Sequence, residues 1–124
     1  MNYYLDIDGT IITKDHQQAD GLNSFLTHLL NNGNVYWLTT HCKEGKTNKV
    51  LSYLEPILDK ENFELIKKIK ATTWQTLKTE AINFSEPFMW FDDYILEIEK
   101  EVLKNNNSLN KWIKIDLSKH HKLY

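Results

Sequence analysis

NYYLDIDGTIITK, from Asn2 to Lys14, is an apolar run that ends in two acids one residue apart. Asp6 and Asp8 are these acids, and Gly9 and Thr10 follow at once. Residues i and i+2 of an extended strand point to the same side, so the two carboxylates are expected to share one face. A turn can end a strand with one Asp and a Gly, but it does not need a second acid on that side. A bound cation would use both.

The size and composition of the chain predict one globular domain spanning residues 1–124. It has 124 residues, a formal net charge of −2 and a single cysteine, Cys42, so no disulfide and no Cys-rich metal motif can be assembled. No apolar run approaches ~20 residues, and Asp6 and Asp8 fall where the apolar part of a signal peptide would lie. We therefore expect a cytoplasmic protein that does not enter the membrane. Its mild acidity gives no reason to expect general binding to nucleic acid.

Apolar and aromatic runs bounded by polar turns predict the strands. Four such runs are Tyr3–Ile7, Val35–Thr40, Pro87–Asp93 and Lys111–Asp116. A fifth segment, Phe63–Thr73, can be a strand or a short irregular piece. We assign it to a strand because the alternation of strands and helices then continues unbroken.

Helical periods lie between these runs. The predicted helices follow Asp20 up to a stop at Asn31–Asn34, run from Lys46 to Leu58, begin near Leu77, and run from Tyr94 to Asn105. Strands alternating with helices indicate a three-layer α/β/α sandwich around a mainly parallel sheet.

Polar side chains gather where the predicted strands end. Asp6 and Asp8 follow the first strand, Thr39 and Thr40 the second, and Asp92 and Asp93 the strand of the PFMWFDD segment. Ligands of an open parallel sheet bind beyond the carboxyl ends of its strands. Carboxylates crowded there repel one another unless a hard cation such as Mg²⁺ binds them. The sequence therefore predicts a Mg²⁺ site built from Asp6, Asp8, Asp92 and Asp93.

Phosphoryl transfer needs a nucleophile, a proton donor and groups that stabilise the phosphoryl oxygens. Asp6 can attack phosphorus and form an aspartyl phosphate. Asp8 can protonate the leaving oxygen and then take a proton from the water that hydrolyses the intermediate. These two acids are the predicted catalytic pair.

Five residues are candidates for binding the phosphate. Gly9 permits a tight turn, so that its amide and that of Thr10 can point at the phosphate. Thr39 offers a hydroxyl and Lys78 a cation, and both are also counted as catalytic. Thr40 is a further candidate, with capping of the next helix as the alternative.

Four segments in this order resemble the motifs of the haloacid dehalogenase-like hydrolase superfamily: LDIDGT (Leu5–Thr10), WLTT (Trp37–Thr40), Lys78 in TLKTEA, and WFDD (Trp90–Asp93). The resemblance implies a five-stranded sheet of order 5-4-1-2-3. It also implies Mg²⁺ held by the side chains of Asp6 and Asp92 and by the backbone carbonyl of Asp8, with Asp93 in support. An acid at position 8 accompanies phosphatase and mutase chemistry in that family.

The third motif is open to other lysines, since Lys67, Lys68 and Lys70 compete with Lys78. The resemblance implies a spacing between this lysine and the last acidic strand that favours Lys78, which also opens a predicted helical segment. The intervals Thr10–Val35 and Thr40–Lys78 leave no room for the cap domain found in many members of the family, so an open site is expected. Such a site suits a macromolecular phosphate, or a small sugar phosphate if a neighbouring subunit of a homo-oligomer covers it.

The leading hypothesis is a Mg²⁺-dependent phosphatase acting on a phosphomonoester through Asp6. A non-catalytic phosphate-binding or protein-interaction module of the same fold is the alternative. A signalling receiver domain is a third hypothesis, but its acids arrive in another order along the chain. His41 and Cys42 are interpreted as loop residues at the mouth of the site, and His120 and His121 as part of a solvated tail.

Overall fold

The computed structural model describes residues 1–118 and 123, and its strands form one parallel sheet. The strands are β1 (Asn2–Leu5), β2 (Asn34–Trp37), β3 (Phe88–Asp92) and β4 (Trp112–Lys114), in the order β2-β1-β3-β4. β1 lies between β2 and β3 and is parallel to both. The α/β class and the parallel sheet are thus confirmed, and the first strand occupies an interior position.

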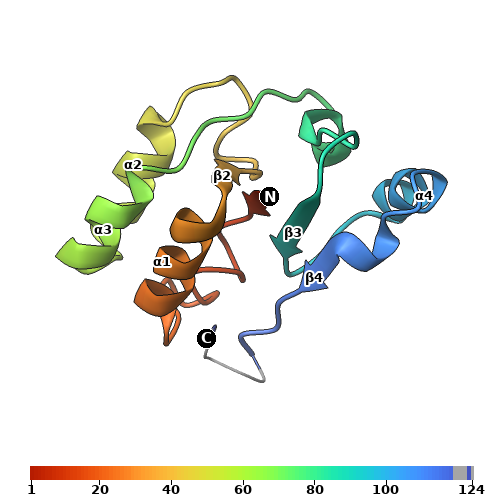
Figure 1. Ribbon diagram of the computed structural model, residues 1–124. Helices are drawn as coiled ribbons and strands as arrows, with labels where there is room; N and C mark the ends of the chain where they lie inside the picture. The colour runs from red at the N-terminus through yellow and green to blue at the C-terminus, as the bar shows by residue number, and fades with distance from the viewer. Residues whose placement is uncertain (119–122, 124) are drawn as a thin grey trace.

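Helices cover both faces of this sheet (Figure 1). On one side lie α1 (Leu22–Asn32), α2 (Asn48–Leu54) and α3 (Lys60–Ile66), and on the other lie α4 (Glu97–Asn105) and the 3₁₀ turn η1 (Lys78–Ala81). A second 3₁₀ turn, η2 (Leu109–Lys111), leads directly into β4. The α1 helix forms because its apolar residues recur at helical spacing and are buried together: Leu22, Phe25, Leu26 and Leu29.

Successive side chains of each strand point to opposite faces of the sheet, so the hydrophobic core has two parts, one on each face. Leu5 and Trp37 pack with the α1 side, whereas Tyr4 and Trp90 pack on the α4 side. Trp37 and Trp90 are fully buried, one in each part of the core. Because both faces of β1 are buried, its position in the sheet is strongly constrained.

The prediction of a fifth strand over Phe63–Thr73 is wrong. The segment begins inside α3, whose start is capped by Asp59: its carboxylate accepts a hydrogen bond from the Asn62 amide at 2.8 Å. After the helix, Lys70 alone forms a parallel bridge with Tyr36 on the outer edge of β2. The sheet therefore has four strands and a one-residue bridge beyond β2.

Two predicted helices are shorter in the structure than expected, and the second strand ends earlier. The predicted helix Lys46–Leu58 is limited to Asn48–Leu54, and the helix expected near Leu77 is only the short η1 turn. The WLTT segment leaves the strand after Trp37, although the Leu38 amide still donates to the Leu5 carbonyl at 2.7 Å. His120 and His121 lie outside the described residues.

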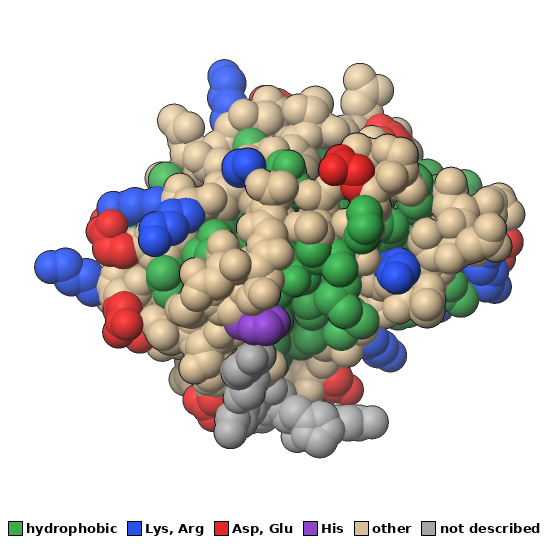
Figure 2. Space-filling view, in the orientation of Figure 1, with side chains coloured by type: hydrophobic (Ala, Val, Ile, Leu, Met, Phe, Trp, Pro, Cys, Tyr) green, Lys and Arg blue, Asp and Glu red, His purple; other side chains and the backbone are tan. Residues whose placement is uncertain are grey.

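The face shown in Figure 2 carries charged side chains of both signs around an apolar patch near its centre. This mixture agrees with the small net charge of the chain. Within the part of the chain that the structure describes, none of the helices has the length and apolar character needed to cross a membrane.

Candidate active site

Three acids meet where β1 and β3 end. Asp6 follows β1 directly, Asp92 is the last residue of β3, and Asp93 comes next. Because the two strands are parallel neighbours, their carboxyl ends lie side by side, and the Asp6 amide donates to the Phe91 carbonyl at 3.0 Å. One carboxylate oxygen from each of the three acids lies within 4.8 Å of the others. Asp6 is 8% exposed and Asp92 only 1%, so at least two of the charges are poorly solvated.

Lys78 joins two of these acids. Its Nζ lies 2.7 Å from Asp92 Oδ2 and 3.3 Å from Asp6 Oδ1. The backbone of Lys78 is held as well, since its amide donates to Glu99 Oε2 at 2.8 Å. The other oxygen of Glu99 accepts a hydrogen bond from the Leu96 amide at the start of α4. Glu99 thus ties η1 to α4 and fixes the point from which the lysine reaches the acids.

Burial and the neighbouring charges shift the pKa values of the three groups Asp6, Asp92 and Lys78. Burial raises the pKa of Asp6 despite the opposing charge of Lys78. Burial, with the negative charge of Asp6 as the second cause, raises the pKa of Asp92 to about 8. Burial acts to lower the pKa of Lys78, but Asp6 and Asp92 outweigh it and the pKa is raised. Keeping Asp6 and Asp92 charged at the same time is therefore unfavourable even beside the Lys78 ammonium.

The donor set suits a hard divalent cation. Carboxylate oxygens are the ligands that Mg²⁺ takes from proteins, and it completes its shell with water and substrate oxygens. Asp6, Asp92 and Asp93 supply three such oxygens from one edge of the sheet. The resemblance assigns Asp8 to the metal through its backbone carbonyl; its carboxylate is not part of this group and contacts Tyr53 and His41 instead.

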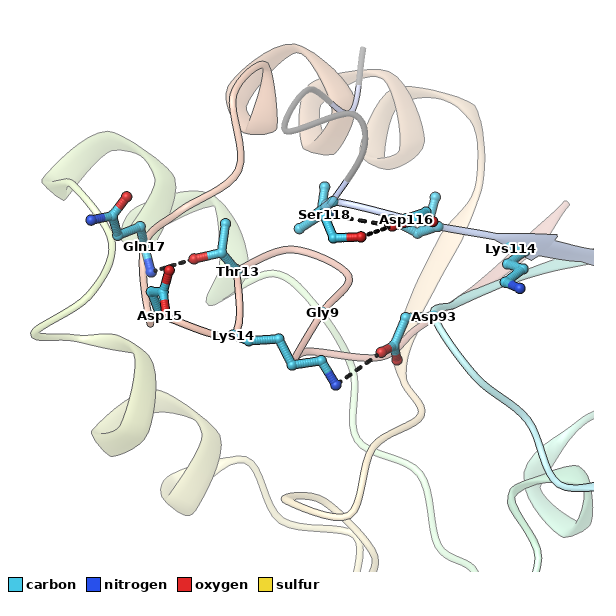
Figure 3. Close-up of a pocket in the computed structure, with 11 residues that line it drawn as sticks. Gly9, Thr13, Lys14, Asp15, Gln17, Asp93, Lys114, Asp116 and Ser118 are labelled. Atoms are coloured by element: carbon cyan, nitrogen blue, oxygen red, sulfur yellow. Dashed lines mark hydrogen bonds and ion pairs between the residues drawn. The ribbon is translucent and has the colours of Figure 1, made fainter.

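Asp93 faces a cavity of about 350 Å³ (Figure 3). The Lys14 side chain extends toward Asp93, and the Lys14 Nζ lies 3.4 Å from Asp93 Oδ2. Gly9 lines the same cavity and has φ +79°, a conformation that suits glycine. A Cβ at Gly9 would lie 2.4 Å from Asp93 Oδ2. Glycine therefore allows the turn after β1 to pass close to the third acid.

Asp8 forms a second cluster, with His41 and Tyr53. The Tyr53 hydroxyl donates to Asp8 Oδ1 at 2.5 Å, and His41 Nε2 lies 2.8 Å from Asp8 Oδ2. The two rings stack with their centroids 4.3 Å apart. Asp8 is turned away from the acids because β1 ends at Leu5, so the two-residue period of a strand does not extend to Asp8.

These contacts shift the acid–base properties of both partners. Partial burial acts to raise the pKa of Asp8, but the hydrogen bonds from Tyr53 and His41 outweigh it and hold that pKa below its usual value. Burial and the hydrogen bond to Asp8 raise the pKa of Tyr53 to about 12. The arrangement therefore stabilises Asp8 in its charged form.

The predicted threonines differ in their surroundings. Thr39 is 1% exposed, and its hydroxyl oxygen accepts a hydrogen bond from the His41 amide at 3.3 Å. The Thr10 hydroxyl is buried and has no hydrogen-bond partner among the described residues. Thr40 is exposed and lines a cavity of about 280 Å³ together with Lys78. Of the three threonines, Thr40 shares a cavity with the site lysine.

Geometry separates the competing lysines. Lys67 pairs with Glu64 on α3 at 2.9 Å, and the Lys70 ammonium donates to Asn34 at 3.1 Å. Lys68 is exposed at the end of α3. Among these candidates, Lys78 is the lysine that contacts Asp6 and Asp92.

Sequence reasoning missed three residues and underrated one. Tyr53 is three positions from the buried Val50, so the helical period could have placed it on the same face of α2. Lys14 and Glu99 gave no local signal, because their roles depend on contacts with distant segments. His41 was interpreted as an exposed loop residue, but it contacts Asp8.

Replacing Lys78 with methionine is expected to destabilise the metal-free protein by about 3 kcal/mol, because two buried acids lose their shared cation. Urea unfolding in EDTA measures this, and adding Asp92→Asn to the variant should restore much of the loss. Lys104→Met is the matched control: Lys104 is exposed and pairs with Glu101, so a change of about 0.5 kcal/mol or less is expected. Equal losses in the two lysine variants would show that the bridging contact is energetically unimportant.

The site thus places a buried carboxylate, a lysine and two further carboxylates at one edge of the sheet, while Asp8 forms a separate cluster with His41 and Tyr53. Such a set can supply an oxygen nucleophile and ligands for a divalent cation. No family model, curated protein or solved structure matches this chain.

Proposed function

We propose that this chain is a Mg²⁺-dependent phosphatase that hydrolyses a phosphomonoester through an aspartyl phosphate on Asp6. The observation that carries the proposal is the contact of Lys78 with both Asp6 and Asp92, with Asp93 within reach of the same cation position. An ion pair alone would need one acid, whereas phosphoryl transfer uses a nucleophile, a metal and a cation together.

A haloacid dehalogenase-like fold is part of this proposal. The strand order β2-β1-β3-β4 supports it, because the family order 5-4-1-2-3 has the same inner arrangement. The Lys70 bridge lies on the outer edge of β2, where that order puts the third strand in sequence. The order of Asp6, Thr39, Lys78 and Asp92 along the chain supports it further.

In the first step of the proposed reaction, a carboxylate oxygen of Asp6 attacks phosphorus as the bond to the leaving oxygen breaks. Asp8 is charged while Tyr53 and His41 hold it, so it first takes a proton from solvent as it gives up one of these hydrogen bonds. It then passes this proton to the leaving oxygen, and the product leaves as an alcohol. The Lys78 ammonium compensates negative charge beside the reacting carboxylate. Mg²⁺ bound by Asp6, Asp92 and Asp93 would supply further positive charge near the phosphoryl oxygens.

In the second step, Asp8 takes a proton from water as the water oxygen attacks phosphorus. The bond between phosphorus and Asp6 then breaks, which releases inorganic phosphate and restores the carboxylate. For both steps Asp8 has to exchange at least one of its present hydrogen bonds, to Tyr53 or to His41, for one to the substrate or to water.

The direct test is hydrolysis of para-nitrophenyl phosphate by the purified protein. We expect release of nitrophenol with Mg²⁺, loss of at least about 90% of the rate in excess EDTA, and recovery when Mg²⁺ is restored. Asp92→Asn should raise the Mg²⁺ concentration needed for half-maximal rate about tenfold or more. Undiminished hydrolysis in EDTA would contradict a metal-dependent mechanism.

A non-catalytic phosphate-binding module is the second candidate. One observation favours it: the Asp8 carboxylate is engaged with Tyr53 and His41. Under this alternative, inorganic phosphate would bind in calorimetry while no phosphomonoester is hydrolysed.

A further inference from the structure

Two regions of the surface flank the candidate active site, and they differ in charge. The cavity of Figure 3 has two lysines, Lys14 and Lys114, and three acids, Asp15, Asp93 and Asp116. Lys14 is already paired with Asp93. This side therefore offers little net attraction to an anion.

The second region, which includes His41, is basic. A cavity of about 410 Å³ there is lined by Lys43, Lys46 and Lys49, with Glu44 as the acid in the lining. Lys46 and Lys49 are exposed, and neither forms an ion pair with any residue in the described part of the chain. His41, which contacts Asp8, lines the same cavity. Lysines gathered around one cavity repel one another, so an anionic ligand would stabilise them.

This basic cavity adjoins the site. Thr40 and Lys43 also line the neighbouring cavity of about 280 Å³, whose wall contains Lys78 and Tyr94. We call the two cavities together, from Lys78 to Lys49, the lysine groove. The groove connects the lysine that contacts Asp6 with the two exposed lysines, Lys46 and Lys49.

Aromatic side chains occur at the inner end of the lysine groove. Tyr94 is 65% exposed and follows Asp93 directly. Trp74 is buried beside it in the wall, and the Lys43 ammonium lies 4.5 Å from the centre of its ring. Proteins that bind single-stranded nucleic acid combine exposed aromatic side chains with lysines or arginines. The bases stack on the aromatic rings, and the phosphates pair with the cations.

We propose that the lysine groove binds a single-stranded nucleic acid whose terminal phosphate is the substrate of Asp6. The terminal phosphate lies at Asp6 and Lys78, the adjacent base contacts Tyr94, and the next phosphates lie among Lys43, Lys46 and Lys49. This assignment rests on the proposed function, since the groove leads to the site of phosphoryl transfer. The small net charge of the chain is compatible with this proposal, because only the lysine groove, and not the whole protein surface, has to attract the end of the nucleic acid.

The test compares substrates that share a terminal phosphate but differ in the group that carries it. They are a single-stranded hexanucleotide with a 5′-phosphate, the same strand with a 3′-phosphate, the matching mononucleotides, and an aryl phosphate. We expect the KM of one phosphorylated hexanucleotide to be at least about tenfold below that of its mononucleotide. The two hexanucleotides show which strand end is used.

Matched variants assign the effect to the groove. Lys46→Gln with Lys49→Gln should raise the hexanucleotide KM about tenfold and lower the salt dependence of binding by roughly 1.4 in the log–log slope. The control, Lys60→Gln with Lys68→Gln, removes two exposed lysines from the α3 segment and should change the KM less than about twofold. Tyr94→Ala should weaken hexanucleotide binding about tenfold.

Binding is also measured without turnover, by the fluorescence anisotropy of a labelled hexanucleotide in EDTA, so that the groove and the catalysis are judged separately. If the protein hydrolyses the aryl phosphate but the double variant of Lys46 and Lys49 binds the hexanucleotide as well as wild type does, the proposed nucleic-acid site is wrong and the proposed phosphatase activity stands. If hexanucleotide binding depends on these lysines but no substrate is hydrolysed, the proposed phosphatase activity is wrong and the proposed nucleic-acid site stands. A phosphopeptide of equal charge that is preferred to the hexanucleotide would overturn the assignment to nucleic acid.

Discussion

Asp6→Asn is expected to lower the Mg²⁺-dependent hydrolysis of para-nitrophenyl phosphate by at least about a thousandfold. The amide keeps the shape of the side chain, but it is a poor nucleophile and carries no charge for Lys78 or for a metal ion to contact. Steady-state kinetics measures the loss. Acid quenching followed by intact-protein mass spectrometry should also show a phosphoryl adduct in the wild-type chain and none in the variant.

Asp20→Asn is the matched control for this change. Asp20 is exposed on the surface ahead of α1, so the same loss of one carboxylate should leave the rate within about twofold of wild type. Full activity in Asp6→Asn would exclude Asp6 as the nucleophile. A phosphoryl adduct that persists in that variant would assign the nucleophile to another residue.

Asp8→Asn has the second largest expected effect, a drop in kcat of about 10²–10⁴-fold for an alkyl phosphate. An alkoxide is a poor leaving group and needs a proton from Asp8, whereas nitrophenolate leaves without one. The loss should therefore be much smaller for formation of the phosphoryl adduct from para-nitrophenyl phosphate. Rapid-quench kinetics on the two substrates measures this difference.

Tyr53→Phe is the companion variant, because it removes one hydrogen bond to Asp8 and keeps the ring that stacks on His41. We expect its kcat to stay within about tenfold of wild type, since the acid remains in place. Equal losses for alkyl and aryl phosphates in Asp8→Asn would argue for a role of Asp8 in positioning rather than in proton transfer.

The parts of the fold that were predictable are those with a strong local signal. β1 and β3 are buried on both faces, and β2 is buried on one face with Tyr36 half-buried on the other, so their sequences are largely apolar runs. The α1 helix has a clear helical period. The Phe63–Thr73 segment was misassigned because its apolar residues fit both a short strand and a short helix. The Asp59 cap that distinguishes the two lies just before the segment.

In the candidate site, too, the residues with a strong local signal were predictable and those that depend on distant contacts were not. Asp6 and Asp92 were predictable as neighbours because parallel strands bring their carboxyl ends together. Lys78 was chosen by the spacing that the family resemblance implies, and only the tertiary structure shows its contacts with Asp6 and Asp92. The partners of Asp8 were not predictable, since Tyr53 lies 45 positions away along the chain. Contacts of this kind depend on how helices dock, which periodicity in one segment does not report.

The two acids of the opening segment depend on different parts of the architecture. Asp6 is anchored by the sheet, through the Phe91 carbonyl, whereas Asp8 is held by a loop and by the short α2 helix, through His41 and Tyr53. Short helices and loops open locally at a lower free energy than interior strands do. Under the proposed mechanism, the nucleophile would therefore lie on the element that opens less readily and the proton donor on the element that opens more readily.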